Sequence, residues 1–324
     1  MIQPTDTKQI LAVDFGGTKL AAGTTCTGFS RWQAFQSILL PPNVDAEGSL
    51  LQVIALVAKL QAETPEPFDA IGVSFGGPVD QEQGVVHLSH HVPGWEHFPL
   101  RNWLEERFGA PAVIANDANA AAFGEHQLGA GRGCRSMMYI TISTGIGGGL
   151  VLDGNLWTGQ DGMAGEIGHM VIDPEGPLCT CGKRGCLESF ASGSAIARQA
   201  MEMLQDKPQP GLIFSRFTDQ TGEITARTIS QACAEGDELA REILEAAAAK
   251  LGTGIGNAAN LLNLERFILG GGVTKAGEGW WDAVRRAAQC TILPGIQISI
   301  LPAQLGDDAP LWGAKILAEL HASL

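Results

Sequence analysis

The sequence predicts an α/β protein with two lobes, for three reasons. The chain has 324 residues, which is enough for two domains of ordinary size. Short apolar runs typical of buried strands alternate with longer stretches of helical periodicity. One unusual unit, a strand followed by a glycine-rich turn and a second strand, occurs twice. Two copies of one unit in a chain of this length indicate two related lobes.

The first copy of this unit lies near the N-terminus, where an apolar run at residues 10–13 ends in Asp14. The turn after it consists of Phe15, Gly16, Gly17, Thr18 and Lys19. Apolar residues return at once, which predicts a second strand rather than a helix. Backbone N–H groups of a Gly-Gly-Thr turn can point at a phosphate, and Asp14 can hold the magnesium that accompanies nucleotide phosphates. A plain hairpin is the alternative, and the polar residues of the turn disfavour it.

The next elements are a helix at residues 48–62, with apolar side chains on one face, and a buried strand at 70–75. The strand leads into a turn that contains Gly77, which can lie against a ligand or only reverse the chain. Adjacent histidines, His90 and His91, precede a Pro-Gly-Trp loop. These histidines are candidates for substrate contact, with surface histidines as the equal alternative.

A further strand at 111–115 ends in Asn116 and Asp117, directly before the alanine-rich helix 118–128. A carboxylate at a strand end and helix start is well placed to project into a cleft, where partial desolvation tunes its basicity. The alternative is a helix N-cap, a position that Asn and Asp both favour. Capping needs only one of the two residues.

The second copy of the strand–turn–strand unit begins with a strand at 137–142 and continues into the glycine string 143–149. The string resembles a dinucleotide fingerprint, but that motif must open a helix, and here a strand follows. A Walker A sequence is also absent, because Gly182-Lys183 is followed by Arg184. Two phosphate-binding turns of one kind predict two lobes that face each other across a nucleotide.

The segment 165–188 concentrates residues that bind metals. Cys179 and Cys181 stand one residue apart, Cys186 follows, and His169 lies upstream across a turn that contains Pro and Gly. Four ligands of this type suit tetrahedral zinc and leave no position for water, so the site is predicted to be structural. The alternatives are a redox disulfide and three buried cysteines without partners, which a chain with intracellular features disfavours.

Two carboxylates, Glu166 and Glu188, flank this predicted zinc cluster. A metal-bound imidazole keeps its second nitrogen for a hydrogen-bond partner, which fixes its tautomer. Two carboxylates and an oriented imidazole are groups with which a protein can bind a polyhydroxylated ligand. The cluster is therefore predicted to hold Glu166, His169 and Glu188 in place for a sugar.

The C-terminal part contains further predicted elements: helix 193–204, a surface excursion at 205–222, helix 237–260, strand 267–269, strand 296–301 and helix 310–321. Glycines in the long helix, among them Gly252, Gly254 and Gly256, indicate close packing. Strand 267–269 leads into three glycines around Gly271, where a flat base or a ribose can lie close to the backbone.

The composition limits the function classes. The chain carries 21 Lys and Arg against 35 Asp and Glu, a net charge of −14, which argues against a general affinity for nucleic acid or anionic membranes. The N-terminus lacks a basic-then-apolar signal, and no segment supplies the ~18 consecutive apolar residues of a membrane helix. We expect a cytoplasmic protein.

With these residues described, the chain resembles the ROK family of sugar kinases along nearly its whole length. The resemblance rests on DFGGTK at 14–19, ANDANAAAFGE at 115–125, STGIGGG at 143–149, and the block from GEIGH to CTCGKRGCLE. It implies an actin-like ATPase (ribonuclease H-like) fold with two lobes around a central cleft, and a homodimer or higher homo-oligomer. The smaller lobe would comprise residues 1–115 and the C-terminal helix 310–324, and the larger lobe residues 116–309 with the zinc motif.

The resemblance also implies a role for each matched position. Asp117 matches the catalytic base. The sugar-binding residues would be Gly77, His91, Asn116, Asp117, Glu166, His169 and Glu188. The ATP-binding residues would be Asp14, Gly16, Gly17, Thr18, Lys19, Thr144, Gly145, Gly147 and Gly271. Zinc would be bound by His169, Cys179, Cys181 and Cys186, and Asp14 would hold Mg²⁺.

These roles predict ATP-dependent phosphorylation of the 6-hydroxyl of a hexose, with glucose first. Many family glucokinases carry Asn before the Pro-Gly-Trp loop, where this chain has His91, so the sugar stays open. One alternative is N-acetylmannosamine or N-acetylglucosamine. The alternative from another class is a sugar-responsive transcriptional regulator, which needs a DNA-reading helix-turn-helix ahead of the sugar lobe. Only nine residues precede the first strand here, which disfavours it.

Overall fold

The computed structural model describes residues 7–89, 92–206 and 223–322, and the chain forms two compact units. The first unit comprises residues 1–133, 149–164 and 304–324, and the second comprises residues 134–148 and 165–303. The C-terminal helix therefore belongs to the first unit. The boundary expected after Ala115 lies inside that unit, which continues to Gly133.

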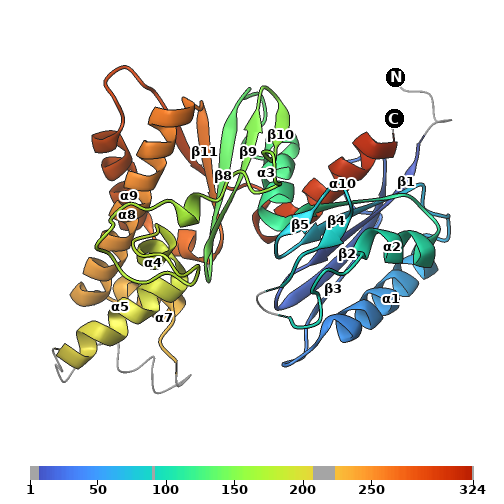
Figure 1. The fold of residues 1–324 in the computed structure, drawn as a ribbon, viewed down its shortest axis with the longest axis horizontal. Helices are drawn as coiled ribbons and strands as arrows, with labels where there is room; N and C mark the ends of the chain where they lie inside the picture. The colour runs from blue at the N-terminus through green and yellow to red at the C-terminus, as the bar shows by residue number, and fades with distance from the viewer. Residues whose placement is uncertain (1–6, 90–91, 207–222, 323–324) are drawn as a thin grey trace. The chain divides into compact units, whose positions relative to one another are not determined.

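The first unit is built on a five-stranded sheet with the order β3-β2-β1-β4-β7 (Figure 1). Its strands are β1 (Gln9–Phe15), β2 (Lys19–Cys26), β3 (Ala34–Leu39), β4 (Ala70–Phe75) and β7 (Ala112–Asn116). Strands β1, β4 and β7 are parallel, and their register aligns Phe15 with Phe75 and Phe75 with Asn116. The residues that follow these three strands therefore share one edge of the sheet.

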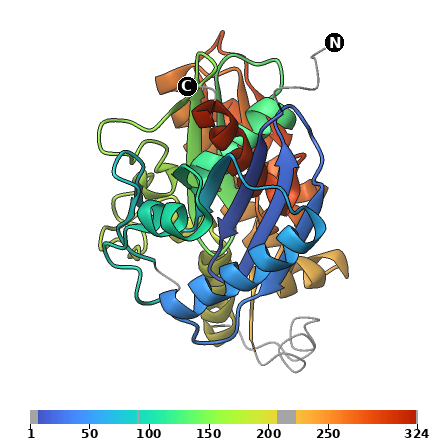
Figure 2. The ribbon, with the colours of Figure 1, turned by 90° about the vertical axis from the view of Figure 1, so that its right-hand side faces the viewer.

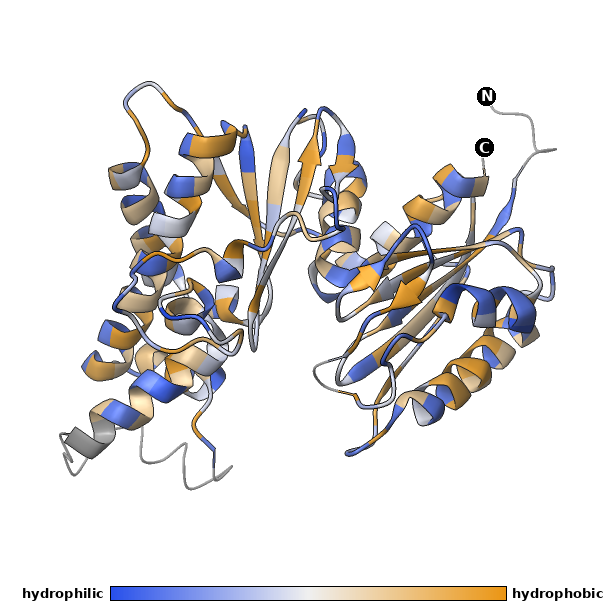
Figure 3. Cartoon of the chain, in the orientation of Figure 1, coloured by the Kyte–Doolittle hydropathy of each residue, from blue (hydrophilic) through white to orange (hydrophobic). Residues whose placement is uncertain are grey.

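Both faces of this sheet are covered, because side chains along β1 alternate between two cores. Leu11 and Val13 join a core that includes helix α1 (Ala46–Glu63) and helix α2 (Leu100–Phe108). Ile10 and Ala12 pack toward helix α10 (Ala309–Ala322), which lies on the other face (Figure 1). Figure 2 shows α1 across the front of the strands. In Figure 3 helix α2 is mostly hydrophilic. Its buried residues are Leu100 and Leu104.

Helix α3 (Asp117–Leu128) packs against α10 through glycines. A Cβ added to Gly313 would lie 1.7 Å from the Ala120 carbonyl oxygen, and one added to Gly124 would lie 2.6 Å from the Ala309 carbonyl oxygen. No side chain fits at either position, so the two helix backbones touch. This contact fixes the start of α3 relative to the sheet.

The second five-stranded sheet has the order β10-β9-β8-β11-β12. Its strands are β8 (Met137–Ile142), β9 (Ile146–Leu152), β10 (Asn155–Trp157), β11 (Arg266–Gly270) and β12 (Ser299–Pro302). Helices α4 (Glu188–Ala191), α5 (Gly193–Asp206), α7 (Ala226–Ala234), α8 (Glu238–Leu262) and α9 (Glu278–Thr291) belong to the second unit. Strand β11 is parallel to both of its neighbours, β8 and β12.

The expected close packing of the long helix is confirmed. A Cβ at Gly252 would lie 2.3 Å from the Val284 carbonyl oxygen of α9, and a Cβ at Gly256 would lie 2.4 Å from Thr291. Helices α8 and α9 therefore approach each other through bare backbone.

Most of the predicted strands and helices are confirmed, with two differences. Strand β12 begins at Ser299 rather than at residue 296. The second glycine turn is shorter than the string suggests, because β9 already begins at Ile146. A Cβ at Gly148 would lie 2.5 Å from the Gly165 carbonyl oxygen, so this glycine allows close packing within a strand. The excursion expected at 205–222 lies almost wholly outside the described residues.

Several elements were not predicted, among them β3, the hairpin of β5 (Val79–Asp80) and β6 (Val85–Val86), α2, α7 and α9. Among the residues described, none of the helices is long and apolar enough to span a membrane.

Candidate active site

The first group of functional side chains lies at the shared edge where β1, β4 and β7 end. Asp14 is the last residue but one of β1, and its side chain is 9% exposed. Its pKa is raised to about 7, mainly by burial; the nearby Asp117 and Asp308 contribute to this rise, and Ser74 and Lys19 oppose it. A buried carboxylate that other carboxylates oppose would gain from a bound cation.

The first glycine turn follows Asp14 and is closed by a hydrogen bond from the Gly16 N–H to the Lys19 carbonyl oxygen, at 3.0 Å. A Cβ at Gly16 would lie 2.8 Å from that same oxygen, so the tight turn requires a glycine. The Lys19 ammonium lies 3.2 Å from Asp308 Oδ1. The turn therefore brings a cation and bare backbone next to the Asp14 carboxylate.

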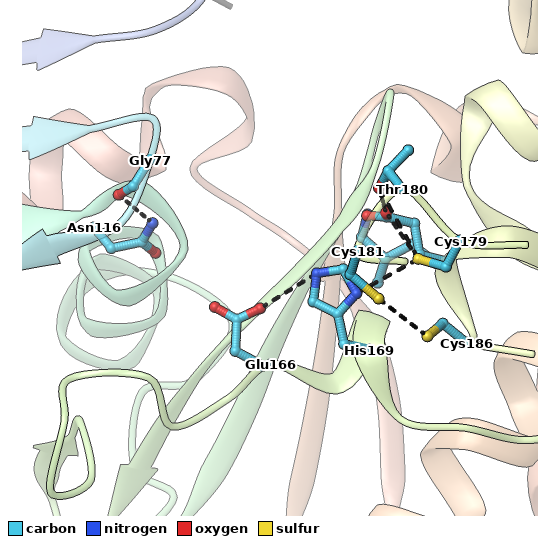
Figure 4. A network of polar contacts seen from close by, with 10 residues as sticks. Gly77, Asn116, Glu166, His169, Cys179, Thr180, Cys181 and Cys186 are labelled. Atoms are coloured by element: carbon cyan, nitrogen blue, oxygen red, sulfur yellow. Dashed lines mark hydrogen bonds and ion pairs between the residues drawn. The ribbon is translucent and has the colours of Figure 1, made fainter. Parts of the chain in front are cut away.

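Asn116 is the N-cap of helix α3, so the capping interpretation of the Asn116-Asp117 pair is confirmed for Asn116. Its Oδ1 accepts from the N–H groups of Ala118 at 3.0 Å and Asn119 at 3.4 Å. Its Nδ2 donates to the Gly77 carbonyl oxygen at 3.0 Å, as Figure 4 shows. Because Asn116 supplies the cap, Asp117 is not needed for it.

Asp117 is the first residue of α3, and its Oδ1 accepts from the Ala118 N–H at 2.8 Å. A Cβ at Gly76 would lie 3.8 Å from Asp117 Oδ2, which places this carboxylate beside the turn after β4. Its charge also acts on Asp14. The structure thus brings Asp14, Gly77, Asn116 and Asp117 together in one unit, whereas the boundary expected after Ala115 would have divided them between two lobes.

The second unit contains a cluster of one histidine and three cysteines, His169, Cys179, Cys181 and Cys186, whose ligand atoms all lie within 4.8 Å of one another. The His169 Nδ1 to Cys179 Sγ distance is 3.7 Å, and the Cys181 Sγ to Cys186 Sγ distance is 3.6 Å (Figure 4). Neighbouring ligands of tetrahedral zinc are about 3.5–3.8 Å apart, given Zn–S and Zn–N lengths of about 2.3 and 2.0 Å. The donor set and its spacing fit zinc.

The loop that carries the cluster is shaped by backbone contacts. Isolated antiparallel bridges join Val171 to Cys186 and Leu178 to Arg184. At Gly185 the backbone has φ 73°, and an added Cβ would lie 1.6 Å from the Asp173 carbonyl oxygen. The ligands therefore converge without a disulfide.

Two thiols of the cluster have shifted pKa values. Burial raises the pKa of Cys186 to about 12, with further contributions from the neighbouring thiols. A hydrogen bond with the Lys183 backbone lowers the pKa of Cys181. Since a metal binds the thiolate, loading the cluster must release protons.

Glu166 and Glu188 take different positions around the cluster. Glu166 Oε2 lies 3.9 Å from His169 Nε2, the nitrogen on the far side of the ring from Cys179 (Figure 4). Glu188 Oε2 accepts from the Ile146 N–H at 2.8 Å, and its Oε1 accepts from the Thr180 hydroxyl at 3.2 Å. Glu188 therefore links the cysteine loop to the second glycine turn.

A cavity of about 830 Å³ opens beside the second glycine turn, within the second unit. Its lining includes Thr144 of that turn, Gly272 after β11, and residues of α5 and α7. The preceding glycine, Gly271, has φ 89°, and an added Cβ would lie 2.3 Å from the Ile142 carbonyl oxygen. The predicted base-binding turn thus lies at the edge of a cavity that Thr144 also lines.

Sequence reasoning missed the wall of this cavity that helix α7 supplies. Thr225, Arg227, Ser230 and Gln231 line it. The capping box in which Thr225 and Thr228 bond each other's backbone N–H groups was a usable signal for the start of α7, but no motif marks the polar side chains. Lys275, also in the lining, is likewise an isolated residue in the sequence.

The predicted site residues within the described parts of the chain thus divide between the two units, and one predicted residue lies outside the described parts. The first unit holds Asp14, Gly16, Gly17, Thr18, Lys19, Gly77, Asn116 and Asp117. The second unit holds Thr144, Gly145, Gly147, Glu166, His169, Cys179, Cys181, Cys186, Glu188 and Gly271. Gly147 lies in strand β9 rather than in the turn. His91, with His90, lies outside the described residues.

Comparison with known proteins gives one family. The sequence profile of the ROK family matches residues 10–320. A glucokinase of Halalkalibacterium halodurans is 37% identical, over 95% of this chain and 94% of its own length. An N-acetylmannosamine kinase of Salmonella typhi is 32% identical, over 95% of this chain and 98% of its own. A crystal structure of a ROK family glucokinase from Streptomyces griseus, in complex with glucose and AMPPNP, superposes with a TM-score of 0.82 at 35% identity and covers 96% of this chain and 99% of that one.

Proposed function

This chain belongs to the ROK family, and from that membership we propose that it is an ATP-dependent hexokinase that transfers a phosphoryl group to the 6-hydroxyl of glucose. The fold expected from the sequence, an actin-like ATPase fold of mixed α and β structure, is that of its structural neighbours. Relatives at 32–37% identity over most of the chain are glucokinases, which supports this activity.

The observation that carries the proposal is the placement of Asp117. Its neighbour Asn116 caps the helix, so the Asp117 carboxylate stands at the helix start beside Gly76 and within electrostatic range of Asp14. A carboxylate placed in this way can accept the proton of a hydroxyl as its oxygen attacks phosphorus. We assign Asp117 as the general base.

The two glycine turns are the proposed phosphate-binding elements. Backbone N–H groups of Gly17 and Thr18 in the first turn, whose closure requires Gly16, with those of Thr144 and Gly145 in the second, would neutralise charge on the phosphates. Lys19 and Gly147 also belong to the proposed ATP-binding residues. The cavity beside Thr144 and Gly271 would hold the adenosine part of ATP.

Asp14 is the residue we propose for Mg²⁺, because burial and two neighbouring carboxylates oppose its charge and a cation would relieve that opposition. When bound, the ion would offset negative charge on the transferring phosphoryl group.

The cysteine–histidine cluster is the proposed zinc site, and its role is structural because four protein ligands complete a tetrahedron. It would fix the His169 ring through Nδ1, leaving Nε2 toward Glu166 for a sugar hydroxyl.

The hexose-binding residues we propose are Gly77, His91, Asn116 and Asp117 together with Glu166, His169 and Glu188. A carboxylate can accept about four hydrogen bonds, so Glu188 retains capacity for a sugar besides its hydrogen bonds with Ile146 and Thr180. We also propose that the protein is a homo-oligomer, as the resemblance implies, and that it acts in the cytoplasm.

The second candidate substrate is N-acetylmannosamine, because a relative at 32% identity acts as a kinase of that name. A competition assay distinguishes the two. The protein is incubated with magnesium, ATP and an equimolar mixture of glucose, mannose, fructose, N-acetylmannosamine and N-acetylglucosamine, and the sugar phosphates are identified by mass and by phosphorus NMR. The proposal predicts glucose 6-phosphate as the main product. If an acetylated sugar phosphate predominated, that sugar would replace glucose as the assigned substrate. If no sugar phosphate formed, the hexokinase assignment would be overturned.

A further inference from the structure

The contacts of Glu188 connect two parts of the second unit that the proposed function treats separately. We propose that Thr180 and Glu188 form a positioning relay that transmits the order of the metal-binding loop to the second glycine turn, so that metal occupancy sets the affinity for the nucleotide. The inference rests on the proposed donor site and extends it, because zinc would then support nucleotide binding as well as the sugar side.

The first step of the relay is the position of Thr180 between two metal ligands. Cys179 and Cys181 flank it, so a metal held by both thiolates fixes the Thr180 backbone from each side. Further backbone hydrogen bonds run from the Cys179 N–H to the Lys183 carbonyl oxygen at 2.7 Å and from the Gly182 N–H to the Cys179 carbonyl oxygen at 3.0 Å. The direction of the Thr180 hydroxyl therefore depends on the loop that the metal organises.

The second step is the hydrogen bond from that hydroxyl to Glu188 Oε1, at 3.2 Å. Cys179 Sγ lies 3.9 Å from the same oxygen. In the metal-loaded protein the Cys179 thiolate has no proton to donate, so the Thr180 hydroxyl is the donor from the loop that selects the orientation of the Glu188 carboxylate.

The third step is the bond from the buried Ile146 N–H to the other carboxylate oxygen, Glu188 Oε2, at 2.8 Å. Ile146 directly follows Gly145, and a Cβ at Gly145 would lie 2.5 Å from Glu188 Oε2. The carboxylate therefore packs against the turn itself. Hydrogen bonds to an ionised acceptor are stronger than those between neutral groups, so this contact is suited to hold a turn in place.

The turn connects directly to the nucleotide cavity. Thr144 lies in its lining, and the Gly193 N–H at the start of α5 donates to the Ser143 carbonyl oxygen at 2.7 Å. One side of the turn is thus held by α5 and the other by Glu188. If the hydrogen bond between Glu188 and the Ile146 N–H were lost, the Thr144 and Gly145 amides would no longer be held in the orientation that phosphate binding needs.

The experiment uses the metal-loaded full-length protein and changes only the relay hydroxyl. Thr180→Val keeps the side-chain shape and removes the donor, whereas Thr180→Ser keeps the donor. Ser189→Ala is the matched control, because Ser189 Oγ bonds the Cys186 carbonyl oxygen at 2.7 Å, beside the metal loop but off the relay. Zinc content is measured for each variant, AMPPNP affinity by calorimetry, and amide hydrogen exchange for the segment that contains Ile146.

We expect Thr180→Val to retain zinc and to bind AMPPNP about 2- to 5-fold more weakly, because it loses one exposed hydrogen bond to a charged group. Amide hydrogen exchange at Ile146 should be faster in this variant. Thr180→Ser should match the unaltered protein. Chelation of the unaltered protein should weaken AMPPNP binding, and in Thr180→Val it should weaken binding by a smaller factor.

Three results would overturn the relay: unchanged affinity and exchange in Thr180→Val, equal weakening in Ser189→Ala, or equal weakening in Thr180→Ser. Failure of the proposed function looks different, because the unaltered, metal-loaded protein would then not bind AMPPNP at all.

Discussion

Replacing Asp14 by Asn tests the electrostatic account of the first glycine turn. The side chain is 9% exposed, and burial raises its pKa from 3.8 to about 7. The folded state therefore binds more protons than the unfolded state between these two values, and the contribution of Asp14 to stability falls as the pH rises through that range. Above the folded pKa, the protein carries a buried charge that it would be more stable without.

The size of the effect follows from the shift. Each pKa unit corresponds to about 1.36 kcal/mol, so between pH 5 and pH 8 the ionisation of Asp14 should cost about 2–3 kcal/mol of folding free energy. Asn cannot ionise and avoids this cost. The free energy of unfolding of the variant, relative to that of the unaltered protein, should rise steadily from pH 5 to pH 7 and level off by pH 8. The variant should also lose phosphotransfer activity.

The assay is urea unfolding in magnesium-free buffer at pH 5, 6, 7 and 8, with the free energy of unfolding compared between the two proteins. Asp282→Asn, at an exposed side chain of α9, gives the baseline for removing one surface charge. Adding magnesium at pH 8 should stabilise the unaltered protein more than Asp14→Asn. A stability difference that stays constant with pH, after subtraction of the baseline, would refute the assignment of a strained buried carboxylate.

Three further predictions concern the metal and the glycines. Elemental analysis should find about one zinc per chain, and chelation should lower the melting temperature; a cluster without metal at full stability would contradict the structural role. Gly313→Ala should destabilise the protein by about 1–3 kcal/mol, since its Cβ would lie 1.7 Å from the Ala120 carbonyl oxygen. Gly279→Ala is the control: this glycine has open space around it, so the substitution should be neutral or stabilising. Equal urea midpoints for the two variants would count against the α3–α10 contact. Gly145→Ala should weaken AMPPNP binding in calorimetry because its Cβ would lie 2.5 Å from Glu188 Oε2, and native affinity in this variant would show that the turn tolerates a side chain.

The convergence of one histidine and three cysteines and the first glycine turn were predictable from sequence because their signals are local. The four cluster ligands lie within eighteen consecutive positions, from His169 to Cys186, and their types and spacing indicate zinc. The first turn is likewise contained in one run of residues. Local patterns of this kind need no knowledge of the tertiary fold.

Other features depend on tertiary contacts that one sequence does not reveal. Asn and Asp are equally good caps, so the residue of the 116–117 pair that caps α3 could not be identified before the bonds from Ala118 and Asn119 to Asn116 were seen. The Glu188 bond to Ile146 joins residues 42 positions apart, and no spacing rule predicts it. Gly148 was assigned to a turn, although it lies in strand β9, where the absence of a side chain allows the Gly165 backbone to pack closely against it.

The most direct test of the central assignment is the kinetics of Asp117→Asn with glucose and magnesium ATP. Because Asn116 rather than Asp117 caps α3, the substitution leaves the cap in place, and the fold should survive. Glucose affinity, measured by calorimetry, should change little. Turnover should fall by about 10²–10⁴-fold, the range for loss of a general base. Turnover at the native rate in this variant would contradict the account of Asp117 as the base.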